Sequence, residues 1–97
     1  TPIFLPAVIG QQMRRLYAAR LARHAGLGTG DLRALLGLPY DFIAGNLLRS
    51  ARKFSGRQLA AAVPLCAQTD FAMKNTGADD AELLKELLLR IAVGGAA

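Results

Sequence analysis

The chain has 97 residues, 53% of them hydrophobic, and carries a formal net charge of +5 at pH 7. This length holds one domain with its own core, and so high an apolar content excludes a disordered chain. A single cysteine excludes an internal disulfide framework and suits a reducing cytosol. No stretch approaches the roughly 18 apolar residues of a membrane span. We therefore expect one domain over residues 1–97, located in the cytoplasm and without a membrane partner.

Alanine and leucine dominate the apolar residues, whereas β-branched residues are few and never alternate as a strand requires. We therefore predict an all-α fold, a single compact bundle of about five helices. The first helix is expected from Pro6 to Ala25, with Gly26 as its C-terminal stop. Its predicted apolar face comprises Ile9, Met13, Leu16, Tyr17 and Leu21. Arg20 falls inside this face, so its charged end should reach either solvent or a partner at an interface between subunits.

The next two helices are expected to be shorter. Residues 28–30 form a predicted loop in which Thr29 is the candidate N-cap, and a helix follows from Asp31 to Leu36. Residues 37–39 then turn the chain. Pro39 is expected to open the third helix, over residues 40–53, because its fixed φ suits the first helical position.

The last two helices begin with clear capping signals. Ser55 and Gln58 have the spacing of a capping box, and the helix they start should continue to about Asn75. Asp79 and Glu82 form a second predicted capping box, before a leucine-rich run over residues 83–91. Those leucines surround most of the helix, so it should be either central in the fold or covered on two sides. In a domain this small, such cover indicates a protein partner.

The charge is unevenly distributed along the chain. Residues 1–57 hold nine Lys or Arg against two acids, a net charge of +7, whereas residues 58–97 hold three against five, a net charge of −2. This asymmetry favours an anionic partner, and it leaves open whether that partner is nucleic acid or an acidic protein surface.

Catalytic and metal-binding patterns are absent from the sequence. No glycine-rich loop ends in the Lys-Ser/Thr pair of a phosphate-binding loop, and one histidine with one cysteine cannot build a zinc site. Cys66 lies in an apolar helical run, which predicts a small core residue rather than a nucleophile. We therefore expect no enzymatic activity and no cofactor or metal.

Several stretches in order resemble one bacterial family. They are the run from Asp31 to Tyr40, with its leucine-glycine-leucine turn and its aromatic residue after proline, then residues 49–55, residues 69–74 and the leucine run 83–91. Three residues of the first helix fit the same pattern: Gln12, Arg14 and Leu16. Together they resemble the C-terminal domain of the delta subunit of bacterial DNA polymerase III, over essentially the whole chain.

The resemblance implies a part in the clamp loader, the ATP-driven machine that places the sliding clamp on primed DNA during replication. The family's C-terminal domain joins those of the gamma/tau and delta prime subunits in a collar that holds the complex together. The sliding clamp and primed DNA are then reached only through the complete complex. The chain is accordingly expected to be the C-terminal fragment of a longer subunit of a DNA-directed DNA polymerase holoenzyme.

Under this resemblance, the expected subunit interface draws on three helices. Its candidate residues are Arg14, Arg15, Arg20, Asp70, Lys74, Leu84, Leu88 and Arg90. Asp70 and Lys74 have the favourable acid-first i,i+4 spacing, which is equally consistent with a plain surface pair. The arginines of the first helix are likewise consistent with a solvated face.

A function of another class remains open. Residues 32–53 have the pattern of a DNA-binding helix-turn-helix, in which Arg49, Arg52 and Lys53 would contact phosphates. Two features count against it. Arg33 occupies a position where that motif needs a small residue, and the second helix begins with an acid, Asp41, facing DNA.

Overall fold

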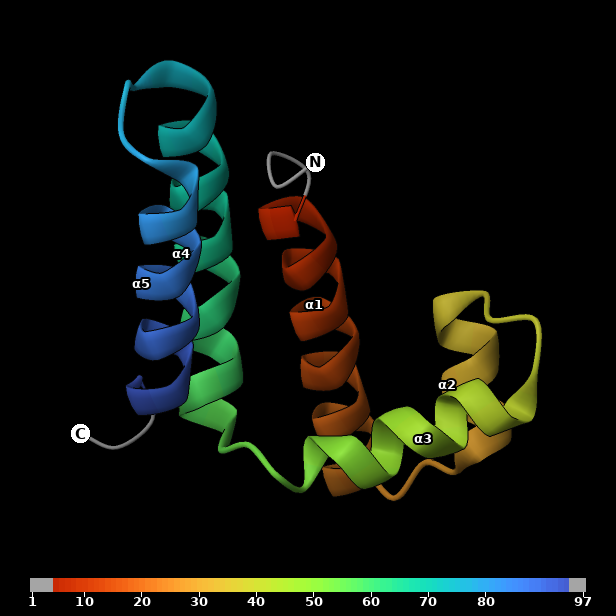
Figure 1. The fold of residues 1–97 in the computed structure, drawn as a ribbon. Helices are drawn as coiled ribbons and strands as arrows, with labels where there is room; N and C mark the ends of the chain where they lie inside the picture. The colour runs from red at the N-terminus through yellow and green to blue at the C-terminus, as the bar shows by residue number, and fades with distance from the viewer. Residues whose placement is uncertain (1–4, 95–97) are drawn as a thin grey trace.

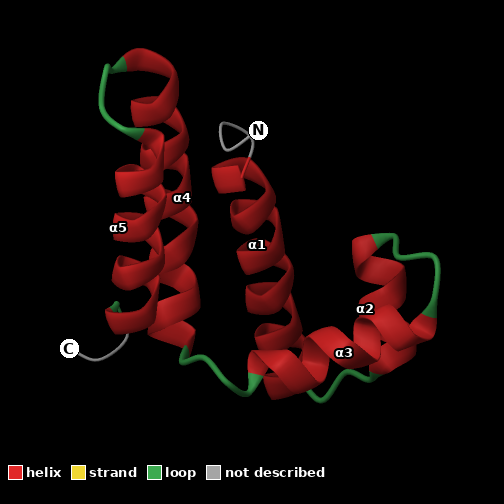
Figure 2. Ribbon diagram, viewed as in Figure 1, coloured by secondary structure: helices red, strands yellow, loops and turns green. Residues whose placement is uncertain are grey.

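The computed structural model describes residues 5–94, which form five helices and no strand (Figure 1, Figure 2). The helices are α1 Leu5–His24, α2 Thr29–Leu36, α3 Asp41–Ala51, α4 Gly56–Asn75 and α5 Asp80–Val93. The predicted all-α class and the predicted number of helices are confirmed. The predicted domain 1–97 extends past the described residues at both ends.

The helices spread into a thin slab. α4 runs antiparallel to both α1 and α5 and packs on each of them, while α2 and α3 lie at the C-terminal end of α1 (Figure 1). The slab measures 44 × 32 × 15 Å along its principal axes. Because it is so thin, a helix within it has few neighbours and keeps part of its circumference uncovered.

Two core clusters hold the slab together. The larger joins α1, α2, α3 and the first turn of α4 through Leu16, Ala19, Ala22, Leu32, Leu38, Ala44, Leu47, Ala51 and Leu59. The smaller joins α4 to α5 through Ala62, Cys66, Leu87 and Ile91, beside Ile9 and Met13 of α1. Cys66 is 2% exposed, which confirms its predicted place in the core. Gly10 lets α1 approach α4 closely, since a Cβ there would lie only 3.2 Å from the Cβ of Cys66.

The buried side of α1 changes along its length. Gly10 faces α4 in the N-terminal half, whereas Ala19 and Ala22 pack into the cluster shared with α2 and α3 in the C-terminal half. Leu21 therefore points away from both sets of neighbours and is 53% exposed. Its predicted place on the apolar face was wrong, because that prediction assumed one continuous buried stripe.

Two predicted helix starts are corrected around α2 and α3. Thr29 is the first residue of α2 rather than its cap, and Gly28 precedes the helix with its N–H donated to Asp31 Oδ2 at 3.1 Å. Pro39 does not open α3; Tyr40 is the extended N-cap, and α3 ends at Ala51, short of the predicted residue 53. Arg33 gives the physical reason, because its Nη2 donates to the Pro39 carbonyl oxygen at 3.2 Å and holds that residue in the turn.

The capping predictions for α4 and α5 have different outcomes. In the confirmed box at α4, Ser55 Oγ accepts the Gln58 N–H at 2.9 Å and Gln58 Oε1 accepts the Ser55 N–H at 3.3 Å. Asp79 caps α5 as expected, but it accepts the Ala81 N–H at 3.0 Å. No reciprocal bond from Glu82 forms within the described part of the chain, so the second capping box was wrong.

Candidate subunit interface and basic pocket

The three α1 candidates for the interface have different surroundings. Arg14 is exposed and Arg15 is half-buried. Arg20 is also half-buried, and its Nη1 donates to the Phe54 carbonyl oxygen at 3.1 Å. This bond joins α1 to the loop before α4, so Arg20 already has a role within the chain.

The predicted pair on α4 is present. Lys74 Nζ lies 3.0 Å from Asp70 Oδ2, and the lysine side chain is 50% exposed against 25% for the aspartate. The other oxygen, Asp70 Oδ1, is buried without a hydrogen-bond partner among residues 5–94. The structure thus shows an intrahelical pair, and its part in an interface stays a prediction.

The α5 candidates frame an apolar surface that the sequence predicted only in part. Leu84 is half-buried, Leu88 is 55% exposed, and Arg90 forms an i,i+4 ion pair with Glu86. Two further side chains of this helix are exposed, Leu89 at 58% and Val93 at 64%. We call Leu88, Leu89 and Val93 the α5 apolar surface. The leucine-rich run 83–91 predicted an apolar surface on this helix, but only the packing of α5 on α4 shows which of its apolar side chains stay exposed.

The candidate interface residues do not form one cluster. Those of α1 and those of α5 belong to helices that each pack on α4 (Figure 1). Asp70 and Lys74 lie towards the end of α4, next to the loop that leads to α5. A partner that touched all of them would have to reach around the slab.

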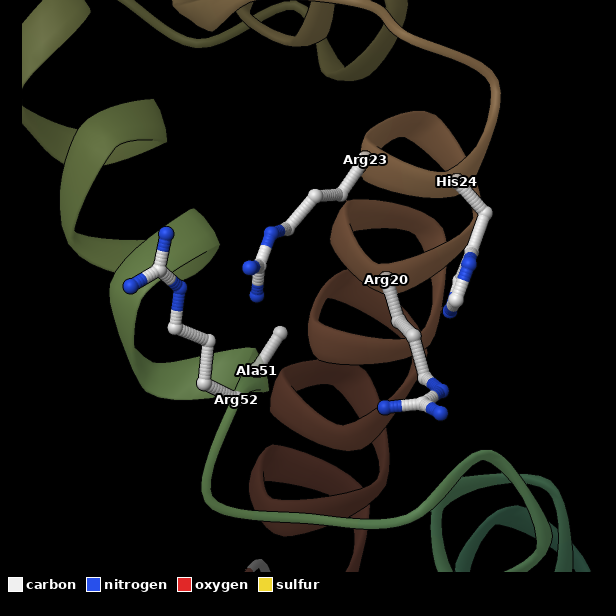
Figure 3. A pocket seen from close by; sticks show the side chains of 5 residues that line it. All are labelled: Arg20, Arg23, His24, Ala51 and Arg52. Atoms are coloured by element: carbon white, nitrogen blue, oxygen red, sulfur yellow. The ribbon is translucent and has the colours of Figure 1, made fainter.

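A basic pocket opens between the C-terminal ends of α1 and α3 (Figure 3). Its volume is about 400 Å³, and it is lined by Arg20, Arg23, His24, Ala51 and Arg52. None of the acidic residues in the chain is among the lining residues. The sequence showed the excess of positive charge in residues 1–57. It did not show the pocket, because the lining residues of α1 lie far along the chain from those at the end of α3.

The predicted helix-turn-helix has a turn held by Arg33. Its Nε donates to the Leu38 carbonyl oxygen at 3.2 Å and lies 3.7 Å from Asp41 Oδ1. The three residues predicted to contact phosphates are all exposed. The Arg49 side chain donates a hydrogen bond to Asn46, Arg52 lines the basic pocket, and Lys53 is not a lining residue of that pocket. Contact of these residues with DNA stays a prediction.

The described segment offers little for catalysis. It holds no group of three or more His, Cys, Asp or Glu placed to bind a metal ion. Burial raises the pKa of the Cys66 thiol, and the nearby positive charge of Arg14 opposes this only in part. A thiol with a raised pKa is a poor nucleophile at neutral pH. Between residues 5 and 94, no helix is both long and apolar enough to cross a membrane.

Comparison with known proteins identifies a family. The family model described as DNA polymerase III delta subunit, C-terminal domain, matches residues 1–91. No curated protein and no solved structure matches the chain.

Proposed function

The chain belongs to the family formed by the C-terminal domain of the DNA polymerase III delta subunit, a clamp-loader component, and we propose that it acts there as a collar domain. In this role it binds the equivalent domains of the gamma/tau and delta prime subunits and keeps the loader assembled. The sliding clamp and primed DNA are reached through the complete complex, and the site of action is the cytoplasm. The chain is then one domain of a longer subunit of the polymerase holoenzyme.

The α5 apolar surface supports this proposal most directly. α5 buries Leu87 and Ile91 at the smaller core cluster, yet Leu88, Leu89 and Val93 remain more than half exposed. Neighbouring exposed apolar side chains on one helix are typical of protein–protein interfaces, because burying them on binding releases water from apolar surface. A sister subunit that covers α5 would give it the second buried side that its leucine content predicts.

The proposal is tested by assembly. The 97-residue chain is mixed with the gamma/tau and delta prime subunits, and the mixture is followed by size-exclusion chromatography with light scattering. We expect a stable complex, which Leu88→Glu should weaken because it places a charge on the apolar surface that the partner would bury. Leu35→Glu is the matched control, since Leu35 is 69% exposed on α2, away from α5.

Two results would contradict the collar role. In the first, the chain fails to associate although the full-length delta subunit assembles with the same partners. In the second, both variants stay folded by circular dichroism but weaken the complex equally, which would show that α5 has no special part in binding.

A further inference from the structure

The basic pocket contains none of the residues of the α5 apolar surface, although Arg20 on its wall is also a predicted interface residue. Three arginines and one histidine line it, and Ala51 is the single apolar residue among them (Figure 3). All seven acidic residues of the chain lie in the described segment, and none reaches the pocket wall. A cavity of this composition favours an anion, because three positive charges act on one small volume.

Arg20 is held in place on the pocket wall before any ligand arrives. Its Nη1 donates to the Phe54 carbonyl oxygen at 3.1 Å, which leaves the other N–H groups of the guanidinium available. Gly56 provides the space for this side chain, since a Cβ at that position would lie 3.0 Å from Arg20 Nε. A side chain that is already ordered loses little entropy on binding, so this arrangement favours affinity.

Arg23 and Arg52 supply the charges that remain unpaired. The side chain of neither residue has a hydrogen bond or an ion pair with another residue between 5 and 94, and both side chains extend into the space between α1 and α3 (Figure 3). The two helices end here, and each helix C-terminus carries about half a negative charge. Three guanidinium groups exceed that sum, so the lining of the pocket has a net positive charge, which favours an anion.

The donors suit phosphate better than carboxylate. Each guanidinium presents pairs of parallel N–H groups, and three of them offer more donors than the two oxygens of one carboxylate can accept. A phosphate group has more oxygens, arranged tetrahedrally, and can carry two negative charges, so it can bond to several guanidinium groups at once. We propose that the pocket formed by Arg20, Arg23, His24 and Arg52 is a phosphate-binding site.

Two sources can supply the same chemistry: a free polyphosphate such as pyrophosphate, or the backbone of a single-stranded nucleic acid crossing the open pocket. The site differs from the predicted helix-turn-helix contacts, because three of its four polar residues lie on α1. Of its lining residues only Arg20 is also a predicted interface residue, and the double variant used below leaves Arg20 unchanged. Phosphate binding and collar assembly can therefore fail independently, and their experiments use different readouts.

The test is a titration of the 97-residue chain with pyrophosphate, followed by NMR at constant ionic strength. The side-chain N–H signals of the pocket arginines and the amides of residues 20–24 and 51–53 should shift and saturate, with a Kd of about 1 mM or tighter. A single-stranded oligothymidylate is the second probe. If the source is nucleic acid, it shifts the same signals and competes with pyrophosphate; if the source is a free polyphosphate, only pyrophosphate does so.

Variants separate the pocket from the general positive charge. Arg23→Gln combined with Arg52→Gln should raise the pyrophosphate Kd by about tenfold or more, since it removes charge-assisted hydrogen bonds. Arg15→Gln combined with Lys85→Gln is the control, because it removes two positive charges outside the pocket and outside the predicted phosphate contacts. Its Kd should stay within about twofold of the original. Gly56→Ala should also weaken binding, by displacing Arg20 with no change in charge.

Three outcomes would overturn the proposal. They are shifts that do not saturate, equal weakening by the pocket variant and its control, and binding of a polyglutamate peptide at the pocket when neither phosphate probe binds. The pocket variant changes exposed side chains, and circular dichroism checks that it remains folded.

Discussion

Gln58 connects the two ends of its amide to different helices, and this makes Gln58→Glu an informative perturbation. The Oε1 atom accepts the Ser55 N–H in the capping box of α4. The Nε2 atom donates to the carbonyl oxygens of Ile91 at 2.8 Å and Ala92 at 3.2 Å, at the C-terminal end of α5. Glutamate keeps the acceptor and loses the donor, so the substitution breaks the connection to α5 and preserves the cap.

Gln58→Glu should change stability in opposite directions in an isolated α4 helix and in the folded chain. In a lone helix, an acid near the N-terminus is favourable by about 0.3–1 kcal/mol. In the folded chain, the variant loses two hydrogen bonds, each contributing about 0.5–1.5 kcal/mol, and the exposed one to Ala92 should count least. It also places a carboxylate next to the negative C-terminal end of α5. The free-energy cost of this repulsion is similar in size to the gain from the same charge at the N-terminus of α4. We expect a net loss of about 1–2 kcal/mol in the free energy of unfolding, from these terms together.

Urea unfolding, followed by circular dichroism at the helix band, measures this difference. Ser55→Ala should cost about 1 kcal/mol through the cap alone. Gln58→Ala should cost at least as much, since it keeps the bond from its backbone N–H to Ser55 Oγ but loses both the Oε1 bond to the Ser55 N–H and the connection to α5. Thermal unfolding should give the same order, at about 4–8 °C per kcal/mol for a domain of this size. A Gln58→Glu variant as stable as the original chain, or more stable, would refute the reasoning.

The remaining predictions concern packing. Gly10→Ala should lower stability by about 1 kcal/mol in urea unfolding, because the added Cβ meets the Cβ of Cys66 at 3.2 Å between two helix backbones; a gain like that of an ordinary helical alanine would contradict the close approach. Leu59→Ala should cost about 2–5 kcal/mol, since Leu59 is 0% exposed, whereas Leu89→Ala on the surface should stay within about 0.5 kcal/mol. The Cys66 thiol, which is buried and has a raised pKa, should react with a thiol reagent at pH 8 at least about tenfold more slowly in the folded chain than in urea; equal rates would place it outside the core.

The family and most of the local structure could be predicted from the sequence. The five helices, the capping box at Ser55 and Gln58, the Asp79 cap and the core position of Cys66 were all predicted and confirmed. These features depend on residues within one or two helical turns of each other. Helix propensity and caps act over that distance, so they can be seen along the chain.

The candidate sites were predicted less well. Arg20 was predicted for the interface and Arg52 for DNA contact, but the structure places them on one pocket wall although 32 positions separate them in the chain. Of the three residues that define the α5 apolar surface, only Leu88 was among the predicted interface residues. Both results depend on how α1 meets α3 and how α5 meets α4, and no local pattern contains that information.

The sequence by itself determined the helical class, the main capping interactions and the positive charge of the first half, because each arises from residue type and near neighbours. The tertiary structure decided that Leu21 lies outside the core, that Arg33 holds Pro39 out of α3, and that two arginines of α1 share one pocket with Arg52, the residue that follows α3. The physical reason is that burial and charge clustering depend on which surfaces meet. In so thin a slab, the elements that a helix packs against change along its length, as they do along α1.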